Sequence, residues 1–218
     1  MTPSRPLIGA LLALVLALPP APTIAQIDLS VRNSFPGRRI GGNTRSRNIC
    51  WTRQFAHLVP VDSVWAPGQP VKIGVLEGPS DTPRSLQIEF RALTPAGQTD
   101  SYGKPLYQRL LSPAPAGITL LTLPPLRQSV SWSSSYVCVE KSPPADDPLF
   151  FITSGEPPAL SLLLSTAPTA DDQRIREALA KLSQSCGGSV SQSEVMRLFG
   201  FTDLEGPQWP LTLPVRCL

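Results

Sequence analysis

The chain has 218 residues, 26 of them proline, and a formal net charge of +3. Proline lacks a backbone donor and breaks helices, so this content excludes an all-helical bundle and a coiled coil. The 41% of hydrophobic residues suffices for a globular core, and the small positive charge provides no general drive toward nucleic acid.

Residues 1–25 have the pattern of a secretory signal peptide. Arg5 precedes an apolar run from Leu7 to Leu18, and the small residue Ala25 stands at the expected cleavage point. The run is shorter than the roughly 20 residues that cross a bilayer. We therefore expect an exported, periplasmic or extracellular protein without a transmembrane segment after cleavage, the alternative being an uncleaved N-terminal anchor.

Residues 26–54 predict an extended, irregular arm rich in arginine and glycine. The segment from position 32 to 53 contains no acid and carries six arginines: Arg32, Arg38, Arg39, Arg45, Arg47 and Arg53. Guanidinium groups bind phosphate and carboxylate, which favours a site for lipopolysaccharide, an anionic polysaccharide or an acidic partner. In the structural alternative, which the fixed glycines of the arm favour, Arg38, Arg39 and Arg45 instead pair with acids of the folded domain such as Glu89 and hold the arm in place.

Residues 55–165 predict an antiparallel β-sandwich, immunoglobulin-like or jelly-roll-like. Short apolar runs alternate with proline and glycine at intervals of about ten residues. The clearest strand is 86–92, where apolar and polar residues alternate. Other expected strands are 71–76, 106–111, 118–123, 130–140, 149–153 and 159–164.

Several aromatic residues lie at expected strand ends or loops. Trp51 and Trp65 are candidate binding residues, because exposed rings there stack on sugars or peptides, and Tyr102 and Tyr107 share this placement. The alternative is that these rings belong to the core. Trp132 lies on the apolar face of its alternating strand, which assigns it to the core.

Residues 166–218 predict a C-terminal helical extension. Thr169 is the expected N-cap of a helix over 170–184, with apolar residues at helical spacing. Ser191 and Glu194 predict a capping box for a second helix that ends at Gly200. Three prolines after position 206 indicate an extended tail.

Four cysteines in an exported chain indicate disulfides, and three pairings are possible. Cys50 and Cys138 bracket the strand-rich region, whereas Cys186 and Cys217 bracket the helical one, which favours a bond within each region. A structural zinc site requires closely spaced pairs such as C-x2-C, which are absent from the sequence. We expect no bound metal and no cofactor.

The run from Phe35 to Arg45, followed by Cys50 and then His57-Leu58-Val59-Pro60, resembles the opening signature of a cyanobacterial secreted family, domain of unknown function 928. The strand from Ile118 to Pro124 and the aromatic strand ending in Cys138 are also similar to that family. The resemblance covers residues 35 to about 140. It implies a cell-envelope protein of undetermined function and brings no catalytic residues.

The sequence offers little catalytic chemistry. His57 is the only histidine, which excludes multi-histidine zinc sites, and its apolar neighbours indicate a structural role. Glu77 and Asp81 form a carboxylate pair of the kind used in glycoside hydrolysis. Our first hypothesis is a non-catalytic envelope module that binds an envelope protein or an anionic polysaccharide, and the alternative is a secreted hydrolase with dispersed carboxylates.

Overall fold

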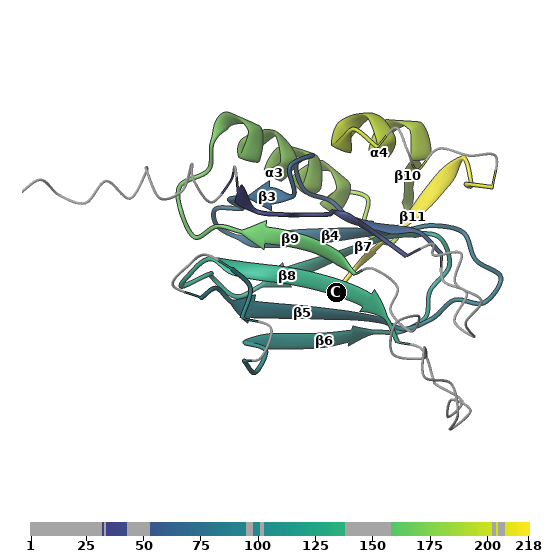
Figure 1. The fold of residues 1–218 in the computed structure, drawn as a ribbon. Coiled ribbons are helices and arrows are strands. Elements are labelled where there is room, and N and C mark those ends of the chain that lie inside the picture. Colours follow the sequence, from purple (N-terminus) through teal and green to yellow (C-terminus); the bar gives the residue numbers. More distant parts are fainter. Residues whose placement is uncertain are drawn as a thin grey trace, which may run out of the picture.

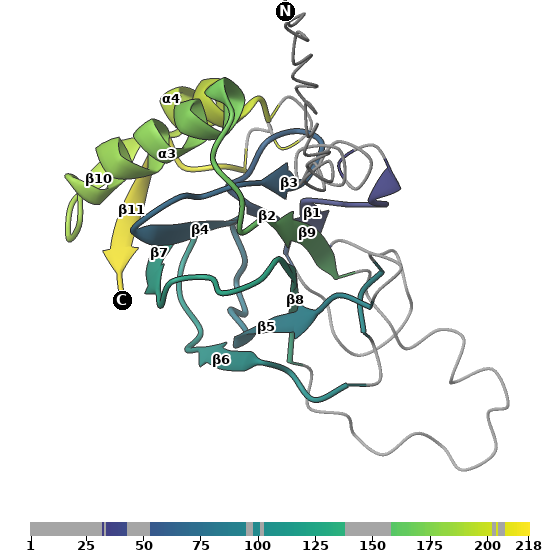
Figure 2. The same ribbon diagram turned by 90° about the vertical axis from the view of Figure 1, so that its left-hand side faces the viewer.

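A computed structural model describes residues 32, 34–42, 53–94, 98–100, 103–137, 158–201, 204 and 208–218. Within them the chain is mainly β, with two sheets and two short helices (Figures 1 and 2). In sheet order, the first sheet comprises β1 (Ile40–Gly41), β2 (Phe55–His57), β4 (Val71–Glu77), β7 (Gly117–Leu123), β11 (Thr212–Cys217) and β10 (Ser189–Ser191). The second comprises β3 (Val64–Trp65), β9 (Ala159–Leu163), β8 (Val130–Tyr136), β5 (Leu86–Ala92) and β6 (Tyr107–Leu111).

The strand predicted over 86–92 is confirmed as β5. Leu86, Ile88 and Phe90 are buried while the residues between them are half-buried, as a strand with one face on the core requires. The same alternation buries Trp132 and Tyr136 in β8. The expected strand over 149–153 lies outside the described residues.

The sheets are not wholly antiparallel, which corrects the predicted architecture. β3 runs parallel to β9, and β11 runs parallel to β7 with Val215 opposite Ile118. The proline-containing tail is therefore a sheet strand, in which Leu213 and Val215 are buried and Pro214 lies between them. The local sequence indicated that the tail is extended. It could not indicate that the tail pairs with β7, because that strand lies almost 100 positions earlier in the chain.

The first predicted helix is confirmed as α3 (Ala170–Ser183). Thr169 and Asp172 form a capping box, in which the Asp172 N–H donates to Thr169 Oγ1 at 3.2 Å and the Thr169 N–H donates to Asp172 Oδ2 at 2.8 Å. Asp172 is fully buried and also accepts a hydrogen bond from the Ala66 N–H at 3.0 Å. This cap therefore joins the helix to the segment after β3.

The second predicted helix is confirmed as α4 (Gln192–Phe199), but its predicted capping box does not form. The Ser191 side chain makes no cap hydrogen bond, and its Oγ lies 2.8 Å from Ser193 Oγ. Glu194 instead accepts a hydrogen bond from Lys181 of α3 at 2.5 Å. At the other end Gly200 adopts a left-handed conformation with φ of 61°, which terminates the helix as expected.

One hydrophobic core includes residues of both sheets and both helices. It contains Leu86 and Trp132 of the predicted sandwich together with Leu179, Phe199 and Val215 of the predicted C-terminal extension. In the structure, the region after position 165 therefore shares its core with the sheets. Figure 1 shows α3 and α4 side by side over one side of the molecule.

The disulfide predicted between Cys186 and Cys217 is confirmed, with the two Cα atoms 5.6 Å apart. It links the turn after α3 to the end of β11. Cys50 and Cys138 lie outside the described residues. Across the described part of the chain, none of the helices has the length and apolar character needed to span a membrane.

Candidate functional site

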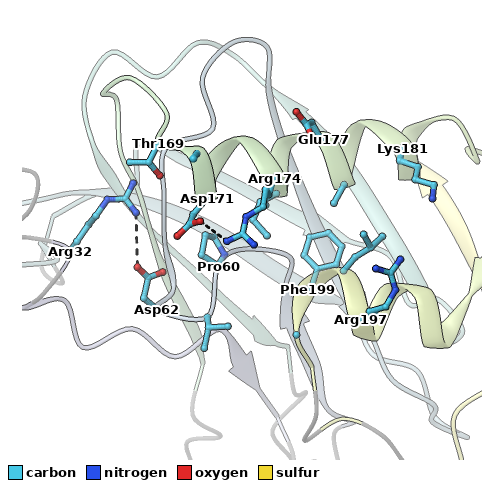
Figure 3. A pocket seen from close by; sticks show the side chains of 16 residues that line it. Arg32, Pro60, Asp62, Thr169, Asp171, Arg174, Glu177, Lys181, Arg197 and Phe199 are labelled. Carbon is cyan, nitrogen blue, oxygen red and sulfur yellow. Dashed lines mark hydrogen bonds and ion pairs between the residues drawn. The ribbon is translucent and has the colours of Figure 1, made fainter.

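A groove with a volume of about 1060 Å³ lies between α3, α4 and the segment that follows β2 (Figure 3). The segment after β2 contributes Pro60, Val61 and Asp62. The remaining lining residues are Arg32, Thr169, Ala170, Asp171, Arg174, Ile175, Glu177, Ala178, Lys181, Arg197, Leu198, Phe199 and Gly200.

The floor of the groove is apolar. Ile175 and Phe199 are packed into the core, whereas Val61 is 73% exposed. The buried Ala178 and the half-buried Leu198 also line the groove. A large exposed aliphatic side chain beside other apolar groups is a typical feature of a contact surface.

The rim of the groove carries charges of both signs. Asp171 accepts a hydrogen bond from Arg174 one turn away on α3, and this pair is exposed. Lys181 pairs with Glu194 across the two helices, and this hydrogen bond lowers the pKa of Glu194. Within the described residues, Arg197 forms no ion pair.

Arg39 is buried behind one end of the groove, where it binds the backbone of residues at that end. Its Nη1 donates to the carbonyls of Val59 at 3.0 Å and Phe199 at 2.6 Å, and its Nη2 donates to that of Gly200 at 2.8 Å. The guanidinium carbon also lies 4.2 Å from the centroid of the Phe201 ring. Because helix C-termini leave carbonyls without intrahelical partners, a cation here satisfies the end of α4. Arg39, predicted as a ligand-binding residue, is thus 7% exposed and acts in the fold.

Arg32 lines the groove and forms ion pairs with two acids. Its Nη2 lies 2.6 Å from the buried Oδ2 of Asp172, and its Nη1 lies 4.0 Å from Asp62 Oδ2 (Figure 3). Arg32 also donates to the Val64 carbonyl at 3.4 Å. Two arginines of the predicted arm therefore fasten the walls of the groove.

The other predicted arm residues are placed differently. Arg38 is exposed and donates to the Pro158 carbonyl at 3.2 Å. The partner suggested for these arginines, Glu89, pairs with Arg91 at 2.9 Å on its own strand, and Arg38 and Arg39 contact backbone carbonyls instead, so the suggested pairing is wrong for these two arginines. Arg45 and Trp51 lie outside the described residues.

Trp65 lies inside the fold, with 1% of its surface exposed. Its Nε1 donates to the Asp172 carbonyl at 3.2 Å. It also lines a second cavity of about 220 Å³, together with Pro70, Arg176 and Leu179. Of the predicted binding residues, neither Arg38, Arg39 nor Trp65 lines the groove.

A buried ionic cluster surrounds Glu77, which is 2% exposed. Arg53 pairs with Glu77 Oε1, and Arg216 lies 3.4 Å from Oε2. Tyr136 donates to Oε1 at 3.3 Å. Burial raises the pKa of Glu77, although the charge of Arg53 opposes this shift. The carboxylate oxygens are thus engaged from both sides, while Asp81 is exposed on the surface, so the pair postulated for hydrolysis does not share an environment.

His57 is fully buried between two serines and a tryptophan. Its Nδ1 lies 2.8 Å from Ser161 Oγ and its Nε2 lies 2.9 Å from Ser134 Oγ. The imidazole stacks on Trp132 with ring centroids 3.5 Å apart. Burial lowers the pKa of His57 well below its usual value, which keeps the ring neutral. These contacts agree with the structural role indicated by its sequence neighbours.

The residues of the groove were not identified from the sequence. Val61 and Arg197 come from segments more than 130 positions apart, and each sits in an ordinary local pattern. The amphipathic pattern of α4 indicated only which side faces the core. Within the described residues, no group of three or more His, Cys, Asp and Glu side chains is arranged to hold a metal ion.

Comparison with known proteins provides no further guide. No family model, curated protein or solved structure matches this chain.

Proposed function

We propose that the protein is an exported, non-catalytic binding module of the cell envelope, and that the groove between α3 and α4 receives an apolar segment of a partner polypeptide. The observation that carries this proposal is the apolar floor with its exposed Val61, enclosed by charges of both signs. Contact surfaces between proteins combine an apolar centre with a polar rim in this way.

The charges of the rim favour a polypeptide over an anionic polysaccharide. The groove is lined by three carboxylates, those of Asp62, Asp171 and Glu177, so a polyanion meets repulsion there as well as the attraction of the four lining cations. A peptide with an apolar centre and charged flanks of both signs meets no such repulsion. An anionic polysaccharide therefore fits the groove less well, although it remains the alternative ligand for the exposed Arg38.

The proposal also includes the compartment, the type of sheet packing and the family of the protein. We assign the protein to the periplasm or the extracellular space on its N-terminal pattern, and the disulfide is compatible with an oxidising compartment. The shared core of the two sheets supports a β-sandwich, for which we keep the immunoglobulin-like or jelly-roll-like type as the proposal. Membership of the domain-of-unknown-function family 928 is likewise a proposal. The hydrolase alternative draws little support from Glu77, whose oxygens are occupied by two arginines.

A photo-crosslinking amino acid at position 61 tests the proposal in the exporting cell. We expect an adduct with one polypeptide at Val61 and none at Leu211, which is 85% exposed and does not line the groove. A synthetic peptide from the crosslinked site then has to bind the purified protein, and Val61→Asp has to weaken that binding at least tenfold. Equal adducts at both positions, or a bound peptide insensitive to Val61→Asp, contradict the proposal. Turnover of a glycoside or ester by the purified protein supports the hydrolase instead.

A further inference from the structure

The cavity of about 220 Å³ lies on the opposite face of α3 from the groove. Arg176, Leu179 and Ala180 line it, and their spacing of three and four residues places them on one side of the helix. The other walls come from the segment between β3 and β4 and from Lys72 near the start of β4. The residues of α3 that line the groove do not line this cavity, so the two sites can be tested separately.

The inner walls of the cavity are apolar. Trp65 and Leu179 are each 1% exposed, and Pro67 is also buried. The polar atom of the Trp65 side chain, Nε1, already donates to the Asp172 carbonyl at 3.2 Å. The indole therefore offers apolar surface to an occupant.

The outer walls of the cavity reach the surface of the protein. Gln69, Pro70 and Ala180 are exposed, so a small molecule can enter from solvent on that side. Two of the walls, Pro67 and Pro70, are prolines, whose rings restrict the backbone. A site that is formed before binding costs less to occupy than one that has to be ordered by its ligand.

Two cations line this otherwise apolar cavity, and there is no acid among the described residues that line it. Arg176 and Lys72 are both half-buried. Neither forms an ion pair with the described part of the chain, and Lys72 Nζ donates to Ser183 Oγ at 3.3 Å. Arg176 Nη1 lies against Gly68, where an added Cβ would approach it to 3.1 Å. The charge of the cavity is therefore complementary to an anion.

The volume of the cavity limits the size of an occupant. An apolar cavity of roughly 150 Å³ holds one benzene molecule. The present cavity, at about 220 Å³, has room for one aromatic ring and a short substituent. It is smaller than the roughly 300–1,000 Å³ of typical ligand pockets. The occupant is therefore a small molecule.

We propose that this cavity binds a small aromatic acid, whose ring lies against Trp65 and whose carboxylate lies between Lys72 and Arg176. Phenylacetate has this composition, with one ring, one methylene group and one carboxylate. The carboxylate accepts charge-assisted hydrogen bonds from both cations. The acid is a free molecule and not the carboxyl terminus of a polypeptide, because the volume leaves no room for a peptide unit.

Nuclear magnetic resonance of the isotope-labelled exported protein tests the proposal, with phenylacetate as the probe. We expect the indole N–H signal of Trp65 to shift in a saturable way, with a dissociation constant of about 1 mM, as is usual for about ten non-hydrogen atoms. The indole signal of Trp132, which is buried against His57, should not move. No saturable shift of the Trp65 signal, or an equal shift of the Trp132 signal, overturns the proposal.

Two related probes test the role of charge. Phenylacetamide has the same shape without the charge, and phenethylamine carries the opposite charge. We expect the amide to bind more weakly by about fivefold or more, and the amine to cause no saturable shift. Equal binding of all three probes overturns the proposal. Acetyl-glycyl-phenylalanine presents the same ring and carboxylate at the end of a peptide, and its binding more tightly than phenylacetate overturns the assignment to a free acid.

Substitution of the cations provides the second measurement. We expect Arg176→Gln and Lys72→Gln each to raise the dissociation constant of phenylacetate by about fivefold or more. Arg174→Gln is the matched control on the same helix, because Arg174 pairs with Asp171 at the groove and does not line the cavity. Circular dichroism checks that the three variants are folded. An affinity that is insensitive to both cavity variants, or equally lowered by Arg174→Gln, overturns the proposal.

Discussion

Replacing Arg39 by methionine tests whether the arginine-rich arm acts inside the fold. Arg39 is 7% exposed and donates to three carbonyls, those of Val59, Phe199 and Gly200. Methionine fills a similar volume but donates nothing, so it leaves these acceptors without their partner. A buried acceptor that loses its donor costs about 1–3 kcal/mol.

We take the lower part of that range for each carbonyl, because the end of α4 can regain some water after the substitution. The expected loss in the free energy of unfolding is then about 3–5 kcal/mol. In a domain of this size each kcal/mol lowers the melting temperature by about 2–4 °C, so the shift is roughly 10 °C. Urea unfolding followed by circular dichroism measures the free energy directly.

Arg38→Met is the matched control at the adjacent position. Arg38 is exposed, and within the described part of the chain its guanidinium donates to the Pro158 carbonyl at 3.2 Å. Its substitution is expected to leave stability nearly unchanged, since water replaces a single exposed hydrogen bond. The reasoning is refuted if Arg39→Met costs less than about 1 kcal/mol, or if the two variants are equally destabilised.

Three further outcomes are expected. The pKa of His57 in the folded protein lies below its value of about 6.5 in the unfolded chain, so the unfolded chain binds more protons at low pH. The free energy of unfolding is therefore expected to fall as the pH drops below about 6.5. Melting curves at pH 5 and pH 8 should show a smaller fall in His57→Gln than in the unmodified protein. Replacing Cys186 and Cys217 by serine opens a link across 31 positions and lowers the free energy of unfolding by about 3–4 kcal/mol, and a loss near zero in urea titrations contradicts this. Mass spectrometry of the exported protein should find a mature N-terminus after Ala25, whereas a chain still beginning at Met1 indicates an uncleaved anchor.

Local pattern alone was sufficient for several elements. The alternation over 86–92 identified β5 with its buried face, because a period of two is a property of the strand itself. Thr169 and the apolar spacing after it identified α3 for a similar reason. The pairing of Cys186 with Cys217 followed from their positions in one region of the chain.

Other features depended on contacts between distant segments. The sequence predicted that the tail is extended, but only packing placed Val215 in a parallel strand beside Ile118. Ser191 and Glu194 have the spacing of a capping box, yet Lys181 on the neighbouring helix takes the carboxylate instead. A local motif is lost when a partner brought in by the tertiary structure binds one of its members more favourably.

The arginine-rich arm illustrates the same division most clearly. Its charge was evident from the sequence, and the pattern left two uses of that charge open, ligand binding and internal pairing, of which internal pairing was favoured. In the structure Arg39 binds the carbonyls at the end of α4, which lie about 160 positions after it in the chain. The groove forms only when the tertiary structure brings α3, α4 and the segment around Val61 together. The sequence does not show which residues surround an exposed valine, because they come from distant parts of the chain.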